Sequence, residues 1–145
     1  MVIKLNNIKK FLGKNMPDSN GRIIGRIIGF CTNMKGEVVS IGVELNNGNF
    51  VEYPSSYLVV SEDFIVRLND WEVEAKDLEW EYELITKRMF ALQELYNSGE
   101  LQKEIYEDTK TQHESALKDI KERSKELIEK LYDLIEDINK QIKTL

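Results

Sequence analysis

The most regular feature of this chain is a heptad spacing of apolar residues that runs from Trp71 to Leu145 without insertion or deletion. With Ala75 as position a, most a and d positions are apolar, and the exceptions concentrate between Gly99 and Ser124. An apolar seam on an otherwise charged helix must be covered by another helix. The pattern therefore predicts a coiled coil or a packed helical hairpin. The seam residues expected to carry the packing are Leu78, Tyr82, Ile85, Met89, Leu92, Tyr96, Leu117, Ile120, Leu127, Leu131, Leu134 and Ile138.

The segment Asn97-Ser-Gly-Glu100 interrupts the best helix-forming stretch, and Asn97 and Glu100 have the spacing of a capping box. Two alternatives remain open at this stage. The helix turns back as a hairpin, or it continues as one rod of roughly 110 Å. The unbroken register across Gly99 favours the rod, whereas the local turn residues favour a hinge at residues 97–101. We favour the hinge.

The last part of this helical segment has a wider apolar face. Ile128, Ile135 and Ile142 occupy position e beside the seam, where a two-stranded coiled coil would leave them partly exposed. An assembly of three or four helices, or an antiparallel pair docked on a neighbour, would bury them. The chain reaches Leu145 at an a position with neither a glycine cap nor a proline stop. We therefore expect either a piece of a longer protein or a shorter relative of one.

The first half of the chain has a different pattern, in which turn residues separate short β-branched and alternating runs. Asn47-Gly48 is the strongest hairpin signal and favours a type I′ turn. We expect a small antiparallel β-barrel over residues 1–69, followed by the helical stalk over 70–145, and hence the α+β class. Five or six strands are expected, among them 23–31, 37–45, 49–53 and a last one around Phe64, Val66 and Leu68.

Alternation along these strands predicts which side chains form the core. Val39, Ile41, Val43 and Leu45 fall on one face of their strand, and we expect Ile41 and Val43 to be buried together with Phe50 and Val66. In the run Gly21-Arg-Ile-Ile-Gly25-Arg-Ile-Ile-Gly29, Gly25 and Gly29 share a strand face. Glycine at such positions allows a strand to coil tightly at a barrel corner.

Charge is distributed unevenly along the chain. The net charge is −6, but residues 1–36 carry seven basic residues against Asp18 alone, which gives +6, and the remaining residues then sum to −12. Nine acidic residues against two basic ones lie between Glu62 and Glu83. The basic excess predicts a surface for an anionic partner, either DNA or an anionic membrane. Its candidate residues are Lys9, Lys10, Lys14, Arg22, Arg26 and Lys35.

The residues that enzymes require are sparse. His113 is the only histidine and Cys31 the only cysteine, so a standard His/Cys metal set and a Ser/His/Asp or Cys/His catalytic arrangement have no support. We expect no enzyme, no cofactor, no metal and no small-molecule substrate. The single cysteine fits a reducing cytosol, and no signal peptide or membrane-spanning run is evident. These features favour a soluble cytoplasmic protein.

A family resemblance appears in both halves. The run Asp18-Ser-Asn-Gly21-Arg-Ile-Ile-Gly25 with the strands around it resembles a PRC-barrel domain. A PRC barrel followed directly by a long coiled coil is similar to the CdvA family of archaeal cell-division proteins. The similarity continues through Ala91-Leu-Gln-Glu-Leu-Tyr-Asn-Ser-Gly-Glu-Leu-Gln-Lys-Glu-Ile-Tyr-Glu-Asp108.

The resemblance implies a filament-forming scaffold that self-associates, binds membrane or DNA at the future division site, and recruits ESCRT-III-like subunits. It also implies a location at mid-cell or on the membrane. In that family the recruiting element is a short segment near the C-terminus, beyond a longer coiled coil, and we assign it to no residue here. Other PRC barrels imply an alternative, an RNA- or ribosome-associated module with a coiled-coil oligomerisation stalk. The acidic whole chain and the absence of an interleaved aromatic platform weaken that alternative.

Overall fold

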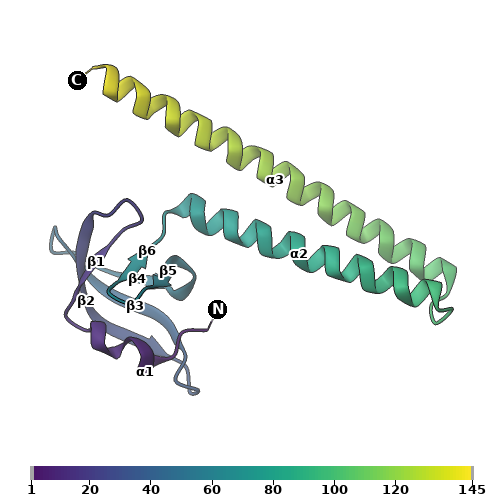
Figure 1. The fold of residues 1–145 in the computed structure, drawn as a ribbon, viewed down its shortest axis with the longest axis horizontal. Coiled ribbons are helices and arrows are strands. Elements are labelled where there is room, and N and C mark those ends of the chain that lie inside the picture. Colours follow the sequence, from purple (N-terminus) through teal and green to yellow (C-terminus); the bar gives the residue numbers. More distant parts are fainter. Residues whose placement is uncertain (1, 145) are drawn as a thin grey trace. The chain divides into compact units, whose positions relative to one another are not determined.

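The computed structural model describes residues 2–144, and the chain divides into two compact units, Met1–Val73 and Glu74–Leu145. The first unit contains antiparallel strands, and the second is formed by two long helices packed on each other (Figure 1). The α+β class is therefore confirmed. The change in glycine and proline content along the sequence follows this division, because turns need these residues and long helices exclude them.

The β domain contains six strands among the described residues. Strands β1 (Asn15–Pro17), β2 (Ile23–Thr32), β3 (Val38–Leu45) and β4 (Phe50–Pro54) form one antiparallel sheet in that order. Strands β5 (Leu58–Val60) and β6 (Ile65–Arg67) form a second, two-stranded sheet (Figure 1). Three short helical turns complete the domain: α1 (Leu5–Ile8), η1 (Lys9–Phe11) and η2 (Ser55–Tyr57).

The expected closed barrel is not found among the described residues. The two sheets share a core, but a single backbone bridge, between Asp18 and Arg67, pairs them, and the strands at the ends of the β1–β4 sheet do not pair with each other. Proline explains part of this arrangement. Pro17 ends β1 at a register shift and Pro54 ends β4, and proline has no backbone N–H with which to extend a ladder.

The core of the β domain contains Ile41 and Val43 as predicted, and both are fully buried with Ile27, Met16 and Ile65. The prediction was wrong for Phe50, which is 68% exposed. Paired residues of an antiparallel ladder point to the same face, and Phe50 pairs with Glu44, whereas the buried Val43 pairs with Val51. Phe50 therefore lies on the outer face.

Two further side chains differ from the predicted alternation. Val39 is exposed although it was grouped with Ile41, and Val66 is only half-buried because Ile65 takes the inward position in β6. In the β2–β3 ladder the register shifts between Ile27 and Gly29 and between Cys31 and Thr32. Such shifts change which side chains face the core, and they cannot be read from one strand alone.

The glycines of β2 have different roles. A Cβ on Gly25 would lie 2.3 Å from the carbonyl oxygen of Glu44 and 2.9 Å from Cγ1 of Val43, so only glycine allows this approach of β2 to β3. Nothing lies within 4 Å of the corresponding position at Gly29, which sits at the register shift. Gly25 is therefore required for the close approach of two strands, whereas the sequence suggested a tightly coiled barrel corner at both glycines.

The β3–β4 turn is a hairpin turn at Asn47 and Gly48, but not of type I′. The N–H of Gly48 donates to the carbonyl of Leu45, and the N–H of Asn49 donates to Oδ1 of Asn47. Gly48 has φ +87°, whereas no non-glycine residue in the described chain has positive φ. A type I′ turn needs positive φ at both central residues, so the turn is of type I with the left-handed glycine after it.

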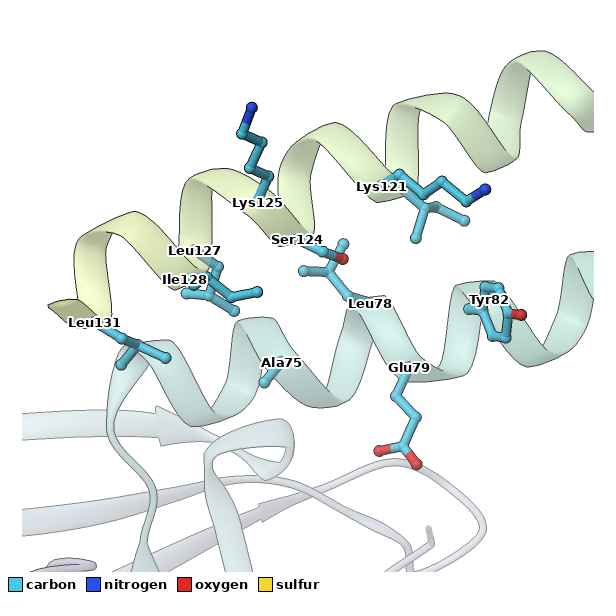
Figure 2. A pocket seen from close by; sticks show the side chains of 11 residues that line it. Ala75, Leu78, Glu79, Tyr82, Lys121, Ser124, Lys125, Leu127, Ile128 and Leu131 are labelled. Atoms are coloured by element: carbon cyan, nitrogen blue, oxygen red, sulfur yellow. The ribbon is translucent and has the colours of Figure 1, made fainter.

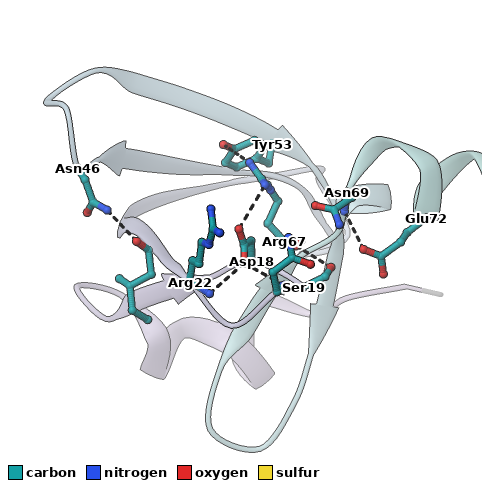
Figure 3. A network of polar contacts seen from close by, with 10 residues as sticks. Asp18, Ser19, Arg22, Asn46, Tyr53, Arg67, Asn69 and Glu72 are labelled. Atoms are coloured by element: carbon teal, nitrogen blue, oxygen red, sulfur yellow. Dashed lines mark hydrogen bonds and ion pairs between the residues drawn. The ribbon is translucent and has the colours of Figure 1, made fainter. Parts of the chain in front are cut away.

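A polar network fixes the turn that follows β1 (Figure 3). The buried carboxylate of Asp18 accepts hydrogen bonds from the backbone N–H groups of Asn20 and Arg22, at 2.9 and 3.0 Å. The same carboxylate lies 3.9 Å from the guanidinium of Arg67 in β6, which also donates to the hydroxyl of Tyr53. The Asp18-x-x-Gly21 pattern is therefore a turn that an ion pair ties to β6.

The helical unit begins with α2 (Asp70–Asn97) and continues with α3 (Lys103–Lys143). Asn69 precedes α2: its carbonyl accepts the first helical N–H bonds, and its own N–H donates to the carboxylate of Glu72. The two helices run in opposite directions (Figure 1). Of the two alternatives left open by the sequence, the structure therefore has the hairpin.

The turn between the helices is a Schellman motif centred on Gly99, which has φ +77°. The N–H of Glu100 donates to the carbonyl of Leu95, and the N–H of Gly99 donates to the carbonyl of Tyr96, each at 3.1 Å. The suggested capping box of Asn97 and Glu100 was wrong, because Asn97 ends α2 and its side chain accepts a hydrogen bond from Gln93 instead.

Candidate functional site

The surface between α2 and α3 is where the predicted seam residues meet. Leu78 of α2 and Ile120 and Leu127 of α3 are buried together, and Ala75, Ile85 and Leu131 pack around them. Each of these side chains lies at an a or d position of the predicted heptads. A two-helix interface buries one stripe per helix, so the remaining faces stay open to solvent or to another protein.

Polar and aromatic contacts fix the register of the two helices. The rings of Tyr96 and Tyr106 stack with their centroids 4.1 Å apart, and the hydroxyl of Tyr106 donates to Oε1 of Gln93. Further along, Nη2 of Arg123 donates to Oε2 of Glu81 at 2.5 Å. The hydrogen bond to Glu81 raises the pKa of Arg123 above its ordinary value. Desolvation opposes this effect, and the charges of Glu81 and Asp119 add to the increase.

An open apolar groove of about 600 Å³ lies between the two helices. Figure 2 shows its walls, with Ala75 of α2 opposite Leu127 and Ile128 of α3, and with Tyr82 opposite Lys121. Charged side chains stand at its rim. The complete lining is Ala75, Leu78, Glu79, Tyr82, Ile120, Lys121, Ser124, Lys125, Leu127, Ile128 and Leu131.

Beyond this groove, α3 carries an exposed apolar stripe. The helix has 41 residues against 28 in α2, and the contacts of Tyr106 and Arg123 place the start of α2 opposite residues near 133 of α3. The residues of α3 after that point have no part of α2 opposite them. We call the exposed side chains that continue from the groove along this helix the α3 stripe: Ile128, Leu134, Ile135, Ile138 and Ile142.

The candidate basic residues of the β domain are all exposed, and the structure brings some of them together. Lys14 and Arg26 lie on paired backbone, since the N–H of Ile27 donates to the carbonyl of Lys14. Lys9 and Lys10 occupy η1, just before Lys14. Arg26 also forms an ion pair with Glu44 at 3.4 Å, which offsets part of its charge.

The remaining two candidates lie elsewhere in the domain. Arg22 follows the Asp18 turn, and Lys35 lies in the turn between β2 and β3. Lys35 shares a shallow depression of about 350 Å³ with Lys4, which the sequence did not single out. The two meet because the N–H of Leu5 donates to the carbonyl of Gly36, a long-range contact that leaves no local signal in the sequence.

Comparison with known proteins assigns the helical unit. A family model described as the CdvA-like coiled-coil domain matches residues 70–145, about half of the chain. The chain belongs to the CdvA family. The resemblance seen in the sequence is therefore confirmed.

The chain is also similar to Cell division protein A of Sulfolobus acidocaldarius, with 32% identity over 143 residues. That alignment covers 98% of this chain and 59% of the relative, so the chain spans about three fifths of the length of the protein it matches. The chain is thus a homologue of an archaeal cell-division protein. The similarity extends through the β domain as well as the CdvA-like coiled-coil domain.

Within the CdvA-like domain, the predicted seam residues separate into three groups by exposure. Leu78, Ile120 and Leu127 are buried, and Tyr82, Leu134 and Ile138 are exposed. The exposed ones lie on the groove rim or on the α3 stripe, where a two-helix hairpin has no third helix to cover them. The half-buried group comprises Ile85, Met89, Leu92, Tyr96, Leu117 and Leu131.

The described residues bear on two other kinds of site, a membrane span and a metal centre. Neither long helix contains a stretch apolar enough to cross a bilayer. Within residues 2–144, no group of three or more His, Cys, Asp and Glu side chains is arranged to hold a metal ion.

Proposed function

We propose that this CdvA-family chain is a structural subunit of an archaeal cell-division apparatus that assembles with copies of itself through its helical hairpin. The basic residues of its β domain hold an anionic partner, DNA or an anionic membrane. By family resemblance, the assembled protein recruits ESCRT-III-like subunits at the division site. The observation that carries the self-assembly is the α3 stripe.

The α3 stripe is too apolar for a surface that only meets water. Ile128, Ile135 and Ile142 are 52%, 54% and 60% exposed, and all three lie at position e beside the seam. Burying a whole isoleucine contributes roughly 1.5–3 kcal/mol, so covering the exposed halves contributes about 1 kcal/mol for each. Together with Leu134 and Ile138, the stripe contributes about 5 kcal/mol on each copy, so a contact between two stripes contributes about 10 kcal/mol before the cost of association.

The α3 stripe and the groove share Ile128, which makes a continuous apolar surface along α3. A helix of another copy that packs along this surface would convert the hairpin into a bundle of more than two helices. Such bundles bury the a, d and e positions together, whereas a pair of helices buries mainly a and d. The heptad pattern and the exposure of the e positions therefore support the same assembly.

The test compares two double variants of α3. Ile135→Gln with Ile142→Gln removes apolar surface from the stripe while keeping helix-forming residues. Glu136→Gln with Lys143→Gln changes exposed positions outside the stripe and leaves the net charge unchanged, so it serves as the matched control. Sedimentation and electron microscopy should show that the first variant loses assembly and that the control retains it. A parent protein that stays monomeric at micromolar concentration would contradict the proposal.

A further inference from the structure

The contacts between α2 and α3 are arranged symmetrically around the turn. Tyr96 and Tyr106, whose rings stack, lie five residues on either side of Leu101. Glu81 and Arg123, which form the ion pair, lie 20 and 22 residues from it. A two-fold axis through residues 101–102 would therefore exchange the partners of each contact. Two copies of the chain can make the same contacts between them that one copy makes within itself.

The heptad register supports such an exchange. Tyr96 at position a and Tyr106 at position d belong to one register that continues through Gly99 and Lys103. A hairpin turn does not require this continuity, because any of the seven heptad phases could follow it. A single helix through residues 97–103 does require it, since only that phase keeps the apolar seam on one side.

The turn is held mainly by its own backbone. The Schellman motif depends on Gly99 at φ +77°, and a Cβ placed there would have no heavy atom within 4 Å. The obstacle to another residue at this position is therefore the left-handed backbone conformation and not packing. Alanine at position 99 would disfavour the turn and favour a continuous helix, by about 20- to 150-fold per chain for the two effects together.

We propose that the hairpin opens at residues 98–102 into a continuous helix, and that two copies of this chain then pair antiparallel by exchanging their α3 helices. The proposal rests on the self-assembly proposed above and identifies the partner of the seam as a second copy. In the exchanged dimer, Glu81 of each chain pairs with Arg123 of the other, and each Tyr96 stacks on a Tyr106 of the other. Gly99 at position d faces Lys103 at position a, and a small residue leaves room for a long one.

A cross-linking experiment separates the two arrangements in the full chain. Cysteines replace Glu81 and Arg123, because the side chains at these two positions are in contact. Cys31→Ser is added because Cys31 is an exposed thiol that would also react. A short bismaleimide then joins positions 81 and 123. A hairpin gives a cross-link within one chain, which migrates as a monomer under denaturing conditions. An exchanged pair gives a covalent dimer.

Two turn variants provide the comparison. Gly99→Ala should increase the ratio of covalent dimer to internally linked monomer by at least tenfold. Insertion of two glycines after Gly99 breaks the heptad phase of a continuous helix while leaving a hairpin possible, so it should remove the covalent dimer. These results together would support the exchange.

The opposing outcomes are distinguishable. If the parent and Gly99→Ala proteins both give only cross-links within one chain, the exchange is wrong. If the same samples sediment as oligomers, the self-assembly proposed above is still supported. Internal cross-links in a protein that is monomeric throughout overturn both proposals. A covalent dimer that is unaffected by the two-glycine insertion overturns the exchange, because such a dimer would not need a continuous helix.

Discussion

Replacement of Leu127 by alanine tests whether the seam identified in the structure, and not the whole predicted heptad pattern, holds the hairpin together. Leu127 and Leu134 occupy successive d positions of α3, but Leu127 is 5% exposed and Leu134 is 46% exposed. Both substitutions remove the same atoms from the same helix and have the same effect on helix propensity. A difference between them therefore measures burial against α2.

The expected magnitudes follow from that difference. Leucine-to-alanine substitution at fully buried positions costs about 2–5 kcal/mol, and the larger values come from rigid cavities. Leu127 lines an open groove that can partly collapse, so we expect about 2–3 kcal/mol for Leu127→Ala. Leu134 is only half-covered and leaves no enclosed cavity, so we expect less than about 1 kcal/mol for Leu134→Ala.

The measurement is urea unfolding monitored by circular dichroism at a helical wavelength. Both variants also carry Ile135→Gln and Ile142→Gln, so that assembly through the α3 stripe does not add to the stability. The midpoint should fall clearly for Leu127→Ala and little for Leu134→Ala, with similar slopes. Equal losses at the two positions would show that Leu134 is covered as well as Leu127, which would refute the assignment of the seam to residues opposite α2.

Two other predictions concern the β domain. Gly25→Ala should destabilise the domain by about 1–3 kcal/mol, because the added Cβ meets the Glu44 carbonyl. The control, Gly29→Ala, should change the thermal unfolding of the domain little. Equal effects of the two substitutions would contradict the close approach at Gly25. Charge reversal at Lys9, Lys10 and Lys14 should weaken DNA binding, and the slope of log K against log salt should become shallower by about 0.9 for each phosphate that is no longer neutralised. The control, charge reversal at Lys118, Lys130 and Lys140 on α3, should have neither effect. Binding that persists in high salt after reversal of Lys9, Lys10 and Lys14 would exclude these three residues as the DNA contact.

The sequence predicted the helices well because their signal is local and repeated. Leu78, Ile120 and Leu127 were placed on the seam by heptad spacing alone, and all three are buried. The same spacing could not distinguish a hairpin from a rod, since one register satisfies both. It also could not show where α2 ceases to cover α3, because that depends on the relative lengths of the two helices. Leu134 and Ile138 were therefore grouped with buried residues although they are exposed.

Prediction of the β domain was limited by contacts between distant segments. Alternation identified Ile41 and Val43 in a long central strand, where many neighbours enforce one face. Phe50 lies in the edge strand β4, whose register against β3 decided its exposure. Likewise, Asp18 belongs to the run that carries the family resemblance, but its ion pair with Arg67 joins residues almost fifty positions apart. No pattern within either segment encodes that pairing.

The part of the seam that α2 covers is distinct from the open α3 stripe, and this distinction bears on how the chain could form a polymer. Exchange of α3 between two chains uses the seam and closes as a symmetric dimer, because each chain gives and receives the same contact. A closed dimer does not extend by itself. Apart from Ile128 at the groove, the α3 stripe has no part of α2 opposite it, whether α2 comes from the same chain or from a partner, so it stays open in both arrangements. Each dimer would then carry two such stripes, and a contact between stripes of successive dimers would extend the assembly. Because both surfaces are apolar, such a polymer should resist high salt, whereas binding of an anionic partner to the basic residues of the β domain should not.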